Sequence, residues 1–126
     1  MTTPSSAPLS PQTFYILLAL SRGQSHAYAL KHRVADASLG AVKMPDGTLY
    51  FQIKRLISSN LIEAAGYCVP YYGSQERLHY SITDLGLIKL KSDLLRQRHA
   101  VEIADAEGFF NDELPLETQE LLARLK

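Results

Sequence analysis

Apolar residues recur at three- and four-residue spacing in three successive segments of the N-terminal half. The first segment covers 11–22 and follows Ser10, a common capping residue type, with a proline at the first helical position. The second covers 26–37 after Ser25, another candidate cap, and the third covers about 46–59. Such spacing is typical of helices that bury one face, so it predicts three short helices. Their apolar positions include Phe14, Leu17, Leu18, Tyr28, Leu30, Val34, Leu49, Ile53, Leu56 and Ile57.

The pattern then changes from helical spacing to alternation. Residues 77–82 alternate between polar and apolar side chains, which is typical of a strand with one buried face. Residues 62–69 are a second strand candidate, and the stretch 70–76 between them has the proline, glycine and serine of a turn. Three helices followed by a hairpin predict a winged helix-turn-helix domain. The fold class is therefore mostly α with a small β-hairpin wing.

A long helical pattern follows the hairpin, from Thr83 as its cap to about residue 107. It carries two neighbouring apolar stripes, so it needs two surfaces to cover it: its own domain and a second one. Another copy of the chain is the simplest candidate, because two-fold dimers are the commonest soluble oligomers. The segment is therefore predicted to be a dimerisation helix. The residues assigned to the dimer seam are Leu87, Leu90, Leu94 and Val101.

These patterns divide the chain into four parts. We expect a flexible arm over 1–9, the winged helix-turn-helix domain over 10–82, the dimerisation helix over 83–107, and an acidic tail with a short C-terminal helix over 108–126. The overall net charge is zero. However, residues 1–62 hold six Lys/Arg and two acids, a net charge of +4, whereas the rest of the chain holds seven and eleven, a net charge of −4.

Composition excludes several other classes of protein. Hydrophobic residues make up 46% and charged residues 21% of the chain, as in an ordinary soluble domain. No secretory signal or membrane-spanning run is apparent, and a lone cysteine fits a reducing compartment, so we expect a cytoplasmic protein. Cys68 is expected to be a buried inert thiol, with a redox sensor as the alternative. No metal-ligand spacing and no paired nucleophile and base occur, so neither a metal, a cofactor nor an enzyme is expected.

Five fragments together resemble the PadR family of transcriptional regulators, over Leu9 to about Ala104. They are ILLAL (16–20), HAYAL (26–30), GTLY (47–50), KRLISSNLI (54–62) and HYSITDLG (79–86). Their order and spacing carry the resemblance, most specifically GTLY followed by KRL and LI. It implies a winged-helix domain, a long C-terminal dimerisation helix, and DNA binding near a promoter. Members usually repress transcription and are often released by a small molecule or another signal.

The chain departs from the pattern of similar sequences at three places. Ala27 stands where glycine is common, and Phe51 stands where proline is common. The wings of similar sequences carry several Arg or Lys before the second strand, whereas this wing pairs Arg77 with Glu76. The electrostatic attraction between this wing and DNA phosphates is therefore expected to be weaker.

The third helix is the candidate reader of DNA bases. Lys54 and Arg55 lie off its apolar face, where they can donate to guanine acceptors in the major groove. Phe51 either meets a thymine methyl group or packs under the wing. Thr48 and Tyr50 can donate to phosphates near the helix N-terminus, a favourable site for anions.

Other candidate DNA contacts lie outside the third helix. Lys43, before that helix, and Arg77, in the wing, are expected to contact phosphates. The resemblance implies that Tyr28 and His26, at the start of the second helix, meet the DNA backbone. The alternative for Tyr28 is packing in the core.

Three hypotheses follow from these residues. The first is a homodimeric, sequence-specific DNA-binding regulator, a repressor rather than an activator. A dimer would read a near-palindromic operator whose half-sites lie roughly 34–36 Å apart. The second is a winged-helix protein-interaction module that does not bind DNA and acts through its acidic tail. The third adds an unidentified small-molecule effector, bound in the dimer groove, to the first.

Overall fold

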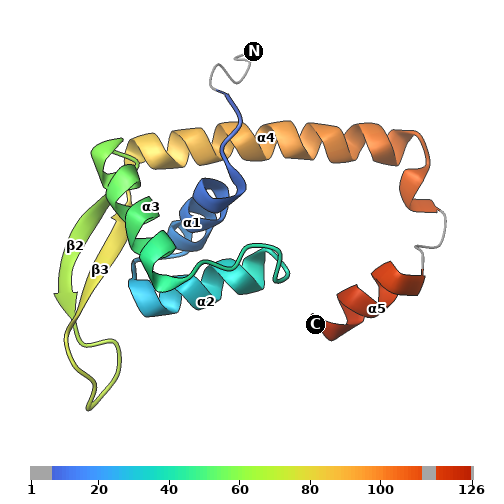
Figure 1. Cartoon of the computed structure of the whole chain (residues 1–126). Coiled ribbons are helices and arrows are strands. Elements are labelled where there is room, and N and C mark those ends of the chain that lie inside the picture. The colour runs from blue at the N-terminus through green and yellow to red at the C-terminus, as the bar shows by residue number, and fades with distance from the viewer. Residues whose placement is uncertain (1–6, 112–115, 126) are drawn as a thin grey trace.

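The computed structural model describes residues 7–111 and 116–125, which form five α-helices, a short 3-10 helix and a three-stranded antiparallel sheet (Figure 1). In chain order the elements are α1 (Pro11–Ser21), β1 (Ser25–His26), α2 (Ala27–Ala37), α3 (Asp46–Ser58), β2 (Ile62–Cys68), β3 (Arg77–Ile82), α4 (Asp84–Ala106), the 3-10 helix η1 (Phe109–Asn111) and α5 (Leu116–Arg124). Three helices, a hairpin and a long helix follow one another as expected, so the predicted fold class is confirmed.

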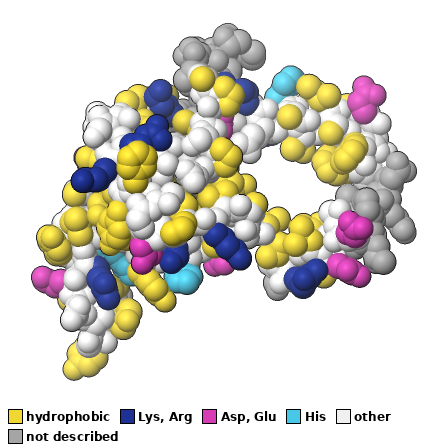
Figure 2. All heavy atoms as spheres, viewed as in Figure 1, with side chains coloured by type: hydrophobic (Ala, Val, Ile, Leu, Met, Phe, Trp, Pro, Cys, Tyr) yellow, Lys and Arg dark blue, Asp and Glu magenta, His cyan; other side chains and the backbone are white. Residues whose placement is uncertain are grey.

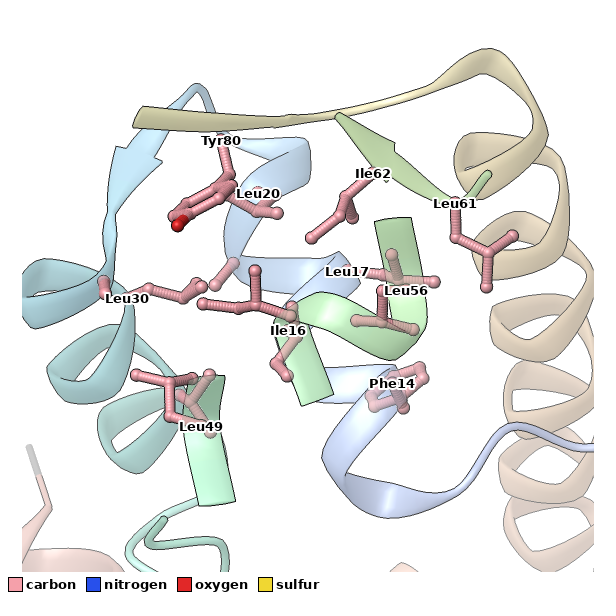
Figure 3. Close-up of a cluster of buried hydrophobic side chains, with 14 of the residues drawn as sticks. Phe14, Ile16, Leu17, Leu20, Leu30, Leu49, Leu56, Leu61, Ile62 and Tyr80 are labelled. Carbon is pink, nitrogen blue, oxygen red and sulfur yellow. The ribbon is translucent and has the colours of Figure 1, made fainter. Parts of the chain in front are cut away.

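The hydrophobic core forms where α1 meets α2, α3, the sheet and the first half of α4 (Figure 3). α1 is buried on most of its sides because it is the central helix, and Ile16 and Leu17 are fully buried. Each fully buried side chain of this size contributes about 1.5–3 kcal/mol to stability. The other labelled members of this cluster are Phe14, Leu20, Leu30, Leu49, Leu56, Leu61, Ile62 and Tyr80.

β1 is a strand of two residues that the sequence pattern does not reveal. It pairs antiparallel with β3, with Ser25 opposite Tyr80 and His26 opposite His79, so β3 is the middle strand. Because Ser25 lies in this strand, the expectation that it caps α2 is wrong. The cap is His26, whose Nδ1 atom accepts a hydrogen bond from the backbone N–H of Ala29 at 3.4 Å.

The first turn of α4 is fixed against the segment that follows α3. Thr83 caps the helix as expected: its hydroxyl accepts from the N–H of Gly86 at 3.0 Å and donates to the carbonyl of Asn60 at 2.7 Å. Gly86 lies so close to the backbone oxygen of Leu61 and the side chain of Ile82 that a Cβ atom there would overlap both. This junction sets the direction in which α4 leaves the domain.

α4 has 23 residues and is therefore about 35 Å long, longer than the domain on which its first half packs (Figure 1). Leu90 is only 3% exposed and belongs to the core of its own chain. This burial contradicts the dimer role expected for Leu90. The other three seam residues, Leu87, Leu94 and Val101, are exposed.

Both ends of the chain are described in part. Residues 1–6 of the expected flexible arm lie outside the described residues, and Leu9 packs partly against the core. Residues 112–115 and 126 of the acidic tail are also outside them. The division of the chain at residues 9, 82 and 107 stays a prediction. Over 7–111 and 116–125, no helix combines the length and apolarity needed to cross a membrane.

Candidate nucleic-acid interface

α3 has a buried face and a solvent-exposed face. Phe51 and Lys54 lie opposite the buried positions, and Tyr50 and Arg55 flank them; all four are exposed. Phe51 is 59% exposed, so the alternative that it packs under the wing does not hold. The opposite face is formed by Leu49, Gln52, Ile53 and Leu56, all buried.

The start of α3 is open and faces solvent. Its N-cap, Pro45, has no side chain that can accept from the first backbone N–H groups, which leaves them available to an anion. The carboxylate of Asp46 accepts from Lys31 Nζ at 3.1 Å, a surface pair that links α2 to α3 but adds little stability. Gly47 is exposed, and a Cβ atom at this position would meet nothing within 4 Å. Thr48 is half-buried beside it.

Tyr28, at the start of α2, projects into solvent. It is 67% exposed, which contradicts the alternative of core packing. Its ring lies parallel to that of His26, with 6.5 Å between centroids, and edge-on to that of His32 at 4.7 Å. A cleft of about 90 Å³ brings Tyr28 together with two other predicted contacts, Tyr50 and Arg77. The remaining lining residues are His26, Ala27, Leu78 and Tyr80.

Lys43 is exposed but does not line this cleft. It lies with the start of α1 around a shallow hollow of about 390 Å³, whose other lining residues are Ser10, Pro11, Gln12, Ala41 and Val42. Three predicted contacts, Tyr28, Tyr50 and Arg77, therefore lie around the cleft between α2, α3 and β3. Lys43 lies at a separate place beside α1. The remaining predicted contacts lie on α3 and line neither hollow; they are Thr48, Phe51, Lys54 and Arg55.

The surroundings of His26, which lines the cleft, lower the pKa of its imidazole. Partial burial is the main cause that lowers this pKa below 6.5, followed by repulsion from His79, Arg77 and Arg33. His79 is buried, although the alternating pattern of β3 predicts it on the polar face. Its ring lies edge-on to His26 at 5.2 Å, and its Nδ1 donates to the carbonyl of Arg77 at 2.8 Å. An anion at this cleft would offset the repulsion.

The surface charge is unevenly distributed over the molecule. In Figure 2, Lys and Arg side chains surround a hydrophobic patch over α3, and Asp and Glu side chains lie around the end of α4 and α5. The part of the surface formed by α3 therefore lies among basic side chains in this view.

Sequence reasoning assigns no role to several exposed residues near this face. Arg33 and His32 lie one turn beyond Tyr28 on α2, and Tyr71 and Tyr72 stand at the tip of the wing. The available signal for His32 was its i+4 spacing from Tyr28, whereas Arg33, five residues after Tyr28, had no such signal. No sequence signal predicted a role for Tyr71 and Tyr72, because exposed tyrosines near a turn are common.

The remaining chemistry of the described residues is limited. Cys68 is half-buried, rather than buried as expected, and its sulfur lies 3.6 Å from the side-chain amide of Gln24. Within 7–111 and 116–125, no group of three His, Cys, Asp or Glu residues is arranged to hold a metal ion.

The order of the elements and the exposed face of α3 define a winged helix-turn-helix protein. The pattern of the transcriptional regulator PadR-like family matches residues 16–92, more than half of the chain. This protein therefore belongs to the PadR-like family of transcriptional regulators. The chain matches no curated protein sequence.

Solved structures with the same fold include a PadR family transcription regulator from Clostridium difficile R20291. It is 20% identical, with a TM-score of 0.62 over 77% of this chain and 97% of that one. Bacillus subtilis PadR, solved in complex with operator DNA, is 19% identical, with a TM-score of 0.57 over 70% of this chain and 48% of that one. A putative regulator from Thermoplasma acidophilum, TA0346, is 24% identical, with a TM-score of 0.56 over 75% and 87%.

Proposed function

We propose that this protein is a homodimeric, sequence-specific DNA-binding repressor that acts in the cytoplasm and reads the major groove with α3. The observation that carries the proposal is the exposed face of α3, on which Phe51 and Lys54 project away from the core. An exposed phenylalanine between a lysine and an arginine offers a partner both apolar and hydrogen-bonding contacts. In the major groove the lysine and Arg55 meet guanine acceptors, and the phenylalanine meets thymine methyl groups.

The residues around α3 supply the contacts that position it. Tyr28, Tyr50 and Arg77 surround one cleft beside α3, and all three end in hydrogen-bond donors suited to phosphate oxygens. Lys43 and Thr48 add donors near the start of α3. Support also comes from a relative of the same family, since Bacillus subtilis PadR has been solved in complex with operator DNA.

The exposed apolar side chains of α4 support the homodimer. Leu87, Leu94 and Val101 are exposed on a helix whose second half extends past its own domain. Burying them against a second copy removes this apolar surface from water. A two-fold dimer carries two α3 helices, so it recognises a near-palindromic operator with half-sites about one helical turn apart.

Fluorescence anisotropy with DNA from upstream of the protein's own gene tests the proposal. We expect tighter binding to this DNA than to scrambled DNA, and a steep loss of affinity with salt. The variant Lys54→Ala/Arg55→Ala should lose the preference. The matched control, Arg22→Ala/Arg124→Ala, removes the same charge from the ends of α1 and α5 and should keep it.

Two outcomes would count against the proposal. If Lys54→Ala/Arg55→Ala bound like the wild type, α3 would not be the reader. If no salt-sensitive DNA binding occurred at all, the protein-interaction module would be the better account, acting through its acidic tail. Phe109 and Phe110, which are exposed at the start of that tail, would then be its first contacts to test.

Repression needs a separate measurement in cells. A reporter gene behind the same upstream DNA should be expressed less when the protein is supplied, and Lys54→Ala/Arg55→Ala should restore expression. An increase on supplying the wild-type protein would instead identify an activator. An effector should be sought by adding small molecules to the anisotropy assay.

A further inference from the structure

An ion pair beside the exposed face of α3 joins this helix to α2. The ammonium nitrogen of Lys31 lies 3.1 Å from the carboxylate Oδ1 of Asp46, the first residue of α3. Lys31 belongs to α2, so the pair forms where the start of α3 lies beside α2 (Figure 1). The side chain of Lys31 is 38% exposed and that of Asp46 is 79% exposed. Because both groups are solvent-accessible, the pair contributes little to stability, and its charges can act on a bound partner.

The pair lies one helical turn from two of the predicted DNA contacts. Lys31 follows Tyr28 by three residues on α2, and Asp46 precedes Tyr50 by four residues on α3. Residues at these spacings are neighbours on a helix surface. Both tyrosines line the cleft between α2, α3 and β3. A phosphate bound by these tyrosines would therefore lie near the charges of Lys31 and Asp46.

Asp46 has opposite effects on the helix and on DNA binding. It is the only acidic residue of α3, and a carboxylate in the first turn stabilises a helix because the N-terminal end of the helix dipole is positive. DNA carries a negative charge on every phosphate, so an uncompensated carboxylate beside its backbone would repel it. Lys31 supplies the compensating charge: among the residues in 7–111 and 116–125, it is the one that forms an ion pair with Asp46.

We propose that Lys31 is a positioning residue for operator binding, whose ammonium group neutralises the Asp46 carboxylate and keeps it turned toward α2. The inference rests on the proposed function, in which Tyr28 and Tyr50 donate to phosphates. Lys31 then contributes to DNA affinity through Asp46 and not through a phosphate contact of its own. Without Lys31, the carboxylate is free to turn toward the DNA. Without both charged groups, the repulsion is absent.

A double-mutant cycle tests whether Lys31 acts through Asp46. In anisotropy titrations with the upstream DNA, Lys31→Gln should weaken binding about fivefold, as for one uncompensated charge about 4 Å from a phosphate in water. Asp46→Asn should bind at least as tightly as the wild type, and Lys31→Gln/Asp46→Asn should return to within about twofold of it. Lys31→Arg keeps a cation for the carboxylate and should bind like the wild type.

The cycle separates this indirect role from two other roles. If Lys31 contacted a phosphate directly, Lys31→Gln/Asp46→Asn would bind as weakly as Lys31→Gln. If the pair only held the two helices together, Asp46→Asn would also break it and would weaken binding in the same way. Either result, or a Lys31→Gln variant that bound like the wild type, would overturn the inference.

Arg22→Gln is the matched control for the loss of one cation. Arg22 is exposed at the end of α1, and its replacement should leave the DNA affinity unchanged. Urea denaturation should show nearly wild-type stability for the Lys31 and Asp46 variants, because the pair lies at the surface. The inference would fail alone if its cycle failed while Lys54→Ala/Arg55→Ala still abolished the preference for the upstream DNA. If the wild type showed no such preference, the proposed function would fail with it.

Discussion

At the scale of single residues, Gly47 separates the needs of the fold from those of DNA binding. A Cβ atom there would meet nothing within 4 Å, so the fold itself does not require glycine at this position. Alanine should stabilise α3 by up to about 1 kcal/mol, because it is the better helix former. If DNA approaches the start of α3 closely, the same Gly47→Ala change should weaken operator binding. Urea denaturation and anisotropy measure the two effects, and unchanged DNA affinity would exclude close approach at Gly47.

His26 should make stability depend on pH. Its pKa is below 6.5 in the folded protein, through burial and the positive charges of His79, Arg77 and Arg33. The unfolded chain therefore binds the proton more tightly, so the free energy of unfolding should fall as the pH drops from above 6.5 to the folded pKa. Protonation also removes the acceptor that His26 offers to Ala29.

Replacing His26 by asparagine isolates this effect. Asparagine is a good N-cap but does not titrate, so His26→Asn should show a smaller loss of stability between about pH 7.5 and 5.5 than the wild type. Urea denaturation at the two pH values measures the difference. An equal loss in both proteins would mean that His26 does not couple folding to pH.

At the scale of elements, a pair of glycines near the starts of two helices should behave oppositely. Gly86, in the first turn of α4, lies against Leu61 and Ile82, and a Cβ atom there would overlap both. Gly86→Ala should therefore destabilise the protein by about 1–3 kcal/mol, as overpacked substitutions do, although alanine favours helix. Urea denaturation of the Gly86→Ala and Gly47→Ala variants compares their changes in the free energy of unfolding. If Gly86→Ala left the free energy of unfolding unchanged, the junction between α3 and α4 would be able to shift and accommodate the added Cβ atom.

Elements long enough to show a period were predictable from the sequence. α1, α3 and α4 repeat their apolar positions over several turns, and the expected bounds agree with the structure to within about one residue. β1 was not predictable, because two residues cannot show a period and its pairing depends on β3, far away in the chain. The same cause misled the assignment of the α2 cap, since Ser25 is a good capping residue by type.

The dimer seam shows a second limit of periodicity. Leu87, Leu90 and Leu94 share one stripe in the sequence, yet Leu90 is buried in its own domain and the other two are exposed. An apolar stripe predicts which residues are buried away from water, but it does not predict which surface covers them. That depends on where α1 crosses α4, which helical spacing does not encode.

At the scale of the whole molecule, the exposed half of α4 should control the oligomeric state. Leu94→Glu/Val101→Glu places two charges on the proposed seam, where burial without a partner is costly. We expect a folded monomer by sedimentation velocity, with operator binding much reduced. Tyr67→Glu, at a position on β2 that is also exposed, should remain a dimer. A dimeric double variant would place the interface elsewhere.

The candidate site was predictable where chemistry and helical spacing coincide. The exposed positions of Lys54 and Phe51 were predictable because the apolar residues of α3 define one buried face, and these two residues lie off it. The grouping of Tyr28, Tyr50 and Arg77 around one cleft was not predictable, because it joins three elements that are distant in the sequence. Arg33 and Tyr71 line one groove between α2 and the wing, and their grouping was not predictable for the same reason.

The central claim is that two α3 helices of a dimer lie in successive major grooves. Protection of guanine N7 from dimethyl sulfate tests it most directly, because that atom is exposed only in the major groove. With the upstream DNA, the wild-type protein should protect guanines in two related half-sites about 10 base pairs apart, and Lys54→Ala/Arg55→Ala should not. Binding without N7 protection, or protection that survives in the variant, would contradict major-groove reading by α3.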